Sequence, residues 1–259
     1  MSRLDDLFTH ARQDGRGLLM PFVVAGYPGL DATEMLLNGL KDAGADIAEV
    51  GFPFSDPIAD GPVIAGAMHE ALCRGVTVDA VFGAAARVRA RTDLGLIAMV
   101  SESIVHRRGG ERFVRQAVDA GFDGFIIPDI DLHAADALLP VIDELDVSLA
   151  LLVAPTTTAP RLAEILQRCR GMVYLLARAG VTGARAALPD LAPRVAEIRR
   201  HSDVPIAVGF GISTPEQVRS ATEQCDAAIA GSAIVDRMRD DEDAAAAGLA
   251  VVETLATGL

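Results

Sequence analysis

Aromatic side chains are scarce in this sequence. Tryptophan is absent, and two tyrosines and nine phenylalanines make up 4% of the 259 residues, although hydrophobic residues as a whole reach 51%. A core of this composition has to be built mainly from alanine, valine, isoleucine and leucine, the residues that dominate parallel strands and the helices that cover them. The composition therefore favours the α/β class.

Cysteine is also scarce. The three cysteines, Cys73, Cys169 and Cys225, are far apart, odd in number and without the C-x-x-C spacing of zinc and redox motifs. This pattern suggests neither a disulfide framework nor a zinc site, and the five scattered histidines show no metal-ligand spacing. We therefore expect no metal in this chain, and a reducing cytoplasm as its location.

Basic residues are fewer than acidic ones: the chain has 23 lysines and arginines but 36 aspartates and glutamates, which gives a formal net charge of -13. Such a balance repels a phosphate backbone, and the two basic clusters, at 87–92 and 106–115, are interrupted and flanked by acids, as in solvated helix faces. We expect no nucleic-acid partner. No apolar run approaches the length of a membrane span and the N-terminus has no apolar signal region, so we also expect no membrane association.

Short apolar runs alternate with amphipathic stretches along the whole chain. Eight of the runs are predicted strands, at 17–26, 45–52, 95–100, 124–129, 148–154, 171–177, 205–211 and 227–233. The stretches between them have helical spacing, and one has a clear start signal with Thr214 as N-cap and Pro215 in the first turn. Eight strand–helix units in about 250 residues are typical of a (β/α)8 TIM barrel. An open doubly wound sheet is the alternative, but the first strand lacks its GxGxxG fingerprint.

The stretch IAEVGFPFSDPIADGP, residues 47–62, places acidic side chains around one predicted strand end. Glu49 lies in an apolar strand, where burial raises the pKa of a carboxyl group and suits it to proton transfer near neutral pH. Asp60 follows in a proline-rich loop and can stay ionised to stabilise positive charge. Two structural alternatives stay open: Glu49 pairs with a lysine or arginine, and Asp56 and Asp60 only cap turns.

Small residues follow the last two predicted strands, in VGFGIST at 208–214 and IAGSAIV at 229–235. Backbone N–H groups at such strand ends can approach a phosphate without obstruction, so the two segments together indicate a phosphate site. The segment AGVTGAR at 179–185 is either a loop that closes over the substrate or a plain surface connection. Tyr174 either lines a pocket or is a core tyrosine.

Six segments occur in an order and spacing that closely resemble the tryptophan synthase alpha chain family: PFVVAGYP, AEVGFPFSDPIADGP, APTT, VYLLARAGVTGAR, VGFGISTPEQV and AGSAIV. The resemblance spans nearly the whole chain and implies a single TIM-barrel domain over residues 1–259. It also implies a lyase that splits indole-3-glycerol phosphate into indole and glyceraldehyde 3-phosphate by retro-aldol cleavage, without metal or organic cofactor. The expected partner is the PLP-dependent beta chain, in an alpha2-beta2 heterotetramer.

The resemblance also implies roles for residues at matching positions. Glu49 corresponds to the catalytic acid and base, and Asp60 corresponds to its partner carboxylate. The substrate-binding positions comprise pocket-lining residues, the closing loop and the phosphate-binding backbone, and they are Phe22, Tyr174, Thr182, Gly183, Gly211, Gly231 and Ser232.

Two segments depart from the family pattern. After the third strand the family commonly has Met-x-Tyr-x-Asn-Pro, whereas this chain has AMVSESIVHRRGG at 98–110; after the fourth, PDIDLHAAD at 128–136 lacks the usual Pro-x-Glu-Glu. The first segment lies in the expected contact region with the beta chain. Three alternative functions stay open: a non-catalytic subunit that activates a beta-type partner, a stand-alone lyase that releases indole, and another sugar-phosphate isomerase or lyase on the same barrel.

Overall fold

One parallel sheet runs through the part of the chain that the structure describes. The computed structural model describes residues 2–57, 60–178, 189–209, 211–239 and 241–259. The strands are β1 (Leu18–Val24), β2 (Ile47–Gly51), β3 (Gly95–Met99), β4 (Gly124–Ile126), β5 (Ser148–Ala150), β6 (Leu152–Val153), β7 (Val173–Leu176), β8 (Ile206–Gly209) and β9 (Ala227–Ala230). They are hydrogen-bonded in the order β5-β4-β3-β2-β1-β9-β8-β7-β6.

The two outer strands of this order, β5 and β6, belong to one predicted strand at 148–154. The sequence predicts it as continuous, but the structure divides it at Leu151, because its first half pairs with β4 and its second half pairs with β7. Since this single segment joins both edges of the sheet, the sheet closes on itself. The predicted (β/α)8 barrel is confirmed, and the open doubly wound alternative is wrong.

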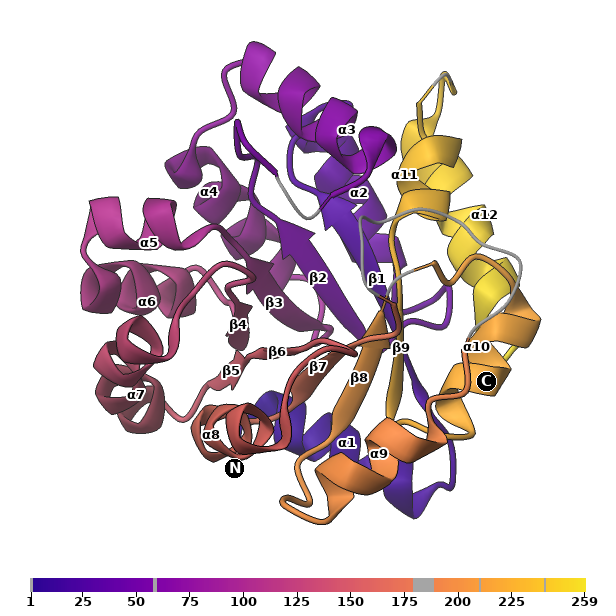
Figure 1. Cartoon of the computed structure of the whole chain (residues 1–259). Coiled ribbons are helices and arrows are strands. Elements are labelled where there is room, and N and C mark those ends of the chain that lie inside the picture. The colour runs from indigo at the N-terminus through magenta and orange to yellow at the C-terminus, as the bar shows by residue number, and fades with distance from the viewer. Residues whose placement is uncertain (1, 58–59, 179–188, 210, 240) are drawn as a thin grey trace.

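Helices cover the outer face of the barrel and one of its ends (Figure 1). They are α1 (Arg3–Gln13), α2 (Leu30–Gly39), α3 (Pro62–Cys73), α4 (Val78–Arg89), α5 (Glu102–Arg108), α6 (Gly110–Asp119), α7 (Leu132–Leu145), α8 (Ala159–Arg168), α9 (Ala192–Arg199), α10 (Pro215–Thr222), α11 (Ser232–Arg237) and α12 (Ala244–Ala256). The predicted start of α10 is confirmed, since Thr214 and Gln217 form a capping box. Helices α1, α5, α11 and α12 were not predicted. None of the described helices is long and apolar enough to cross a membrane.

Alternate residues of the strands face opposite sides of the sheet, as the period of two in a strand requires. The inward side chains form one buried cluster, which includes Met20, Ile47, Ile97 and Ile126. Helix α1 adds Leu4, Phe8 and Ala11 to this cluster, and Leu4 packs against Gly95 and Gly124 where β3 and β4 begin. Helix α1 therefore closes the end of the barrel at which the strands start, opposite α3 and α11 (Figure 1).

Three aspartates that directly precede strands tie this closed end together. Asp46, Asp123 and Asp226 precede β2, β4 and β9, and each accepts a backbone N–H from a neighbouring strand, those of Leu19, Leu96 and Ile206. Arg3 pairs with Asp123 at 3.1 Å and Arg12 pairs with Asp226 at 2.8 Å. Both arginines belong to α1, so these ion pairs fix the helix beneath the barrel.

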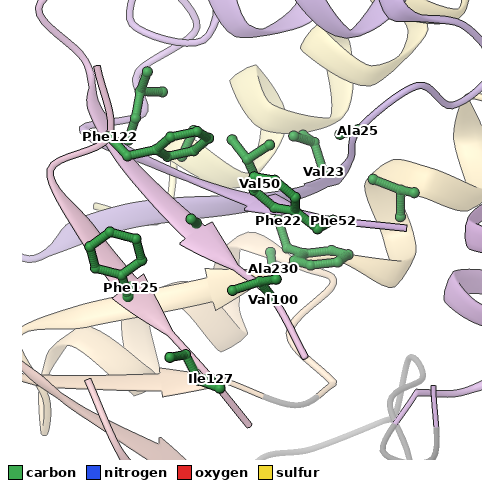
Figure 2. Packing of buried hydrophobic residues seen from close by; sticks show 14 of the residues in the cluster. Phe22, Val23, Ala25, Val50, Phe52, Val100, Phe122, Phe125, Ile127 and Ala230 are labelled. Atoms are coloured by element: carbon green, nitrogen blue, oxygen red, sulfur yellow. The ribbon is translucent and has the colours of Figure 1, made fainter. Parts of the chain in front are cut away.

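Five of the nine phenylalanines pack together between the sheet and the helices on one side. The Phe52 ring centroid lies 5.7 Å from that of Phe82, 6.0 Å from that of Phe113 and 5.7 Å from that of Phe122. Figure 2 shows Phe52, Phe122 and Phe125 among the apolar side chains beside the strands. Because Phe52 directly follows β2, this packing fixes the start of the loop that carries Asp60.

Candidate active site

A cavity lies at the end of the barrel where the strands finish. We call it the strand-end cavity. It is lined by all the described residues to which the family resemblance assigns a role, namely Phe22, Glu49, Asp60, Tyr174, Gly211, Gly231 and Ser232. The other two predicted site residues, Thr182 and Gly183, lie outside the described residues. The structure thus brings together residues from the first and last thirds of the chain.

Glu49 lies inside the barrel, between Phe22 of β1 and Ile97 of β3 in the strand register. Its side chain is 0% exposed, and within the described part of the chain neither carboxyl oxygen has a hydrogen-bond partner. Burial raises the pKa of Glu49, the negative charge of Asp60 adds a smaller increase, and together they bring it to about 8. The alternative in which Glu49 pairs with a lysine or arginine therefore finds no support among the described residues.

Asp60 approaches the same cavity from the loop after β2. Its backbone N–H donates to the Pro57 carbonyl at 3.2 Å, and Gly61 and Pro62 then begin α3. The side chain is half-buried, and burial raises the pKa of Asp60 to about 6. This carboxyl group is thus easier to ionise than that of Glu49.

The two carboxyl groups therefore lose their protons in different pH ranges. Between about pH 6 and pH 8, Glu49 holds its proton while Asp60 is charged. A protonated acid and a carboxylate in one apolar cavity can deliver a proton to one atom of a substrate and stabilise positive charge at another.

Two aromatic rings lie across glycines at strand ends. Phe22 packs so closely on Gly51 that an added Cβ would lie 2.5 Å from the ring, and Tyr174 packs on Gly209 with its hydroxyl 2.2 Å from such a Cβ. Tyr174 is 5% exposed, and burial, with the charges of Glu49 and Asp60, raises the pKa of its phenol well above the ordinary value. The phenol is therefore neutral, and both rings form an apolar wall of the cavity.

Glycine and serine residues also line the strand-end cavity. Gly211, after β8, has a φ of 91°, a backbone angle that residues other than glycine rarely adopt. Gly231 directly precedes α11, and Ser232 is the first residue of that helix. The backbone at these two strand ends therefore reaches the cavity without side chains in the way.

Sequence reasoning missed most of the apolar wall. The additional lining residues are Ile64, Met99, Pro128, Leu152, Leu176 and Ile229. A signal for several of them exists in the strand period: Leu176 follows Tyr174 by two, and residues at that spacing face the same side. Within the described residues, no three or more histidine, cysteine, aspartate or glutamate side chains are grouped to hold a metal ion.

Comparison with known proteins gives a consistent result. The family model described as tryptophan synthase alpha chain matches residues 8–259. The tryptophan synthase alpha chain of Phenylobacterium zucineum is 41% identical over 263 residues, which cover 98% of this chain and 94% of that one. The corresponding chain of Prochlorococcus marinus is 41% identical over 248 residues, which cover 95% of this chain and 89% of that one.

Solved structures agree with these sequence relationships. A tryptophan synthase structure from Mycobacterium tuberculosis superposes with a TM-score of 0.91 at 34% identity, covering 99% of this chain and 98% of that chain. The tryptophan synthase subunit alpha of Legionella pneumophila gives a TM-score of 0.91 at 31% identity, covering 100% and 98%. The chain therefore belongs to the tryptophan synthase alpha chain family, the lyases that cleave indole-3-glycerol phosphate to indole and glyceraldehyde 3-phosphate in L-tryptophan biosynthesis.

Proposed function

We propose that Glu49 is the general acid and base of this lyase reaction and that Asp60 is the carboxylate that binds the indole nitrogen. The observation that supports this assignment is the pair of unequal carboxyl groups in one cavity: Glu49 is fully buried with a pKa of about 8, and Asp60 is half-buried with a pKa of about 6. Each group is then in the protonation state that its role needs near neutral pH.

The reaction begins with proton transfer from the Glu49 carboxyl group to C3 of the indole ring. Positive charge then develops at the ring nitrogen, where the Asp60 carboxylate accepts a hydrogen bond from the N–H and stabilises it. Because of this charge, the ring can accept the electrons of the bond between C3 and the first carbon of the glycerol chain when that bond breaks.

The second step returns the proton to Glu49. The Glu49 carboxylate takes the proton from the hydroxyl of the carbon bonded to C3, that carbon becomes an aldehyde, and the electrons of the breaking carbon–carbon bond neutralise the ring. The products are indole and glyceraldehyde 3-phosphate, and Glu49 is again protonated. One residue thus serves as acid and then as base, and no net proton is consumed.

The remaining predicted residues hold the substrate. Phe22 and Tyr174 contact the indole ring, and the backbone at Gly211, Gly231 and Ser232 binds the phosphate, an assignment supported by their places around the strand-end cavity. Thr182 and Gly183 belong to the loop that we expect to close over the substrate, on the strength of the sequence resemblance alone.

We further propose that this chain is cytoplasmic and needs no cofactor of its own. Its partner is a PLP-dependent beta chain, with which it forms an alpha2-beta2 heterotetramer. The family assignment supports this arrangement, and all the chemistry derived above uses side chains of the chain itself. Of the alternatives, the non-catalytic subunit is disfavoured because both carboxyl groups are present in one cavity.

Single-turnover kinetics of three variants test the assignment. Glu49→Gln keeps the size of the side chain but cannot exchange a proton, so the rate of indole formation should fall by at least about 100-fold. Asp60→Asn should also slow indole formation, because it removes charge stabilisation. Glu70→Gln is the matched control, since Glu70 pairs with Arg74 on the outside of α3. Near-normal indole formation by Glu49→Gln would show that the assignment is wrong.

A further inference from the structure

A second cavity adjoins the strand-end cavity on the side of the loops after β2, β3 and β4. We call it the lateral cavity. It has a volume of about 140 Å³, and it shares Asp60, Met99 and Pro128 with the strand-end cavity. Because the three shared side chains line both spaces, the lateral cavity opens directly beside Asp60. None of the steps proposed above uses this space.

The lining of the lateral cavity is mostly apolar, and its polar side chains are Asp56, Asp60, Ser101 and Asp129. Phe52, Phe54 and Met68 contribute apolar surface, and Ser101 and Asp129 contribute oxygen atoms. The Ser101 hydroxyl donates to the Asp129 carboxylate at 2.7 Å, and the Glu102 backbone N–H donates to the other carboxylate oxygen at 2.8 Å. These hydrogen bonds hold the Ser101 hydroxyl and the Asp129 carboxylate in place at the cavity wall, where both can accept a hydrogen bond.

The substrate orientation set by the two carboxyl groups directs one ring position toward this space. When C3 faces Glu49 and the ring N–H faces Asp60, C2 lies between the two carboxyl groups. The next ring edge beyond the nitrogen carries C7. Since Asp60 lines both cavities, a substituent on C7 extends past Asp60 into the lateral cavity. A substituent on C5 lies on the far edge of the ring and does not.

We propose that the lateral cavity is a specificity subsite for indole-3-glycerol phosphates that carry a hydroxyl group on C7, with Ser101 and Asp129 as its hydrogen-bonding residues. This inference rests on the proposed function, because it uses the roles of Glu49 and Asp60 to orient the ring. The hydroxyl donates to the Asp129 carboxylate or to the Ser101 oxygen, which replaces the hydrogen bonds that it loses on leaving water.

The test compares kcat/KM for indole-3-glycerol phosphate with the values for its 7-hydroxy and 5-hydroxy derivatives, measured by release of the corresponding indole. We expect the 7-hydroxy derivative to be preferred over the 5-hydroxy isomer by about tenfold or more. Ser101→Leu fills the subsite and removes its hydroxyl, and it should lower the ratio of 7-hydroxy to unsubstituted kcat/KM by about tenfold.

Ser103→Ala is the matched control. Ser103 lies in the same helical turn and its hydroxyl is 3.0 Å from that of Ser101, but it does not line the lateral cavity. This variant should keep the same ratio as the wild type. Cleavage of the unsubstituted substrate with equal or better use of the 5-hydroxy isomer would overturn the subsite alone. Failure to cleave any of the three compounds would overturn the proposed function as well.

Discussion

At the scale of single residues, the fully buried Glu49 is the costly feature of the barrel. A carboxyl group without a hydrogen-bond partner among the described residues destabilises an apolar interior, and the cost is greatest when the group is charged. The same burial keeps the group protonated near neutral pH. The burial that destabilises the fold at this position therefore also keeps on Glu49 the proton that the proposed reaction needs.

The pH dependence of kcat/KM follows from the two carboxyl groups. Below about pH 6 Asp60 is protonated and cannot stabilise positive charge, and above about pH 8 Glu49 has lost the proton that it must donate. We therefore expect a bell-shaped profile with apparent pKa values of about 6 and about 8. The measurement is kcat/KM for indole-3-glycerol phosphate across pH 5 to 9, and a flat profile over this range would contradict the assignment.

At the scale of elements, α1 is held to the barrel by partly buried aspartates, and Asp226 is the clearest case. It accepts hydrogen bonds from Arg12 of α1, Arg199 of α9 and the Ile206 N–H. Asp226→Ala leaves these donors without their acceptor and should lower the free energy of unfolding by about 2 kcal/mol.

Urea unfolding followed by circular dichroism measures this loss. The control is Asp236→Ala, which breaks an exposed ion pair with Arg239 and should change the free energy of unfolding by less than about 0.5 kcal/mol. Equal effects of the two substitutions would show that the aspartate ion pairs do not hold α1 in place.

The elements also show where sequence reasoning succeeds. The strands are predictable because buried parallel strands are short apolar runs, and the start of α10 is predictable because Thr214 and Pro215 are local signals. The division of 148–154 into β5 and β6 is not predictable, since it depends on which neighbour each half meets when the barrel closes. The role of α1 as the closing helix is likewise set by packing and not by local sequence.

The same distinction applies to the candidate site. Glu49 and Asp60 are conspicuous in the sequence because an acidic residue in an apolar strand and a proline-rich loop are local features. The lateral cavity depends on three loops that are distant in the chain, and no pattern within any one of them indicates it. The contact of Phe22 with Gly231 is also unpredictable, because it joins the first strand to the last.

At the scale of the whole molecule, the surface near the strand-end cavity bears on the choice of partner. Helix α5 follows β3 beside the lateral cavity and carries Glu102 and the exposed Arg107, where the family pattern has neutral residues. Charges on a docking surface disfavour partners that lack complementary groups. We therefore expect a beta chain from another source to activate this chain poorly.

A titration of lyase activity with such a foreign beta chain measures this effect. The expected result is weak activation even in excess of the beta chain, whereas the chain's own beta partner should activate at near-stoichiometric concentration. Strong activation by the foreign chain at an equal concentration would show that the charged helix α5 does not determine the choice of partner.

The most direct test of the whole account is the reaction of the isolated chain with indole-3-glycerol phosphate, with indole and glyceraldehyde 3-phosphate both quantified. We expect the two products to form in equal amounts, the wild-type chain to form them without added metal or cofactor, and Glu49→Gln to form them at least about 100-fold more slowly. Absence of indole above the uncatalysed background, or an equal rate for Glu49→Gln, would contradict it.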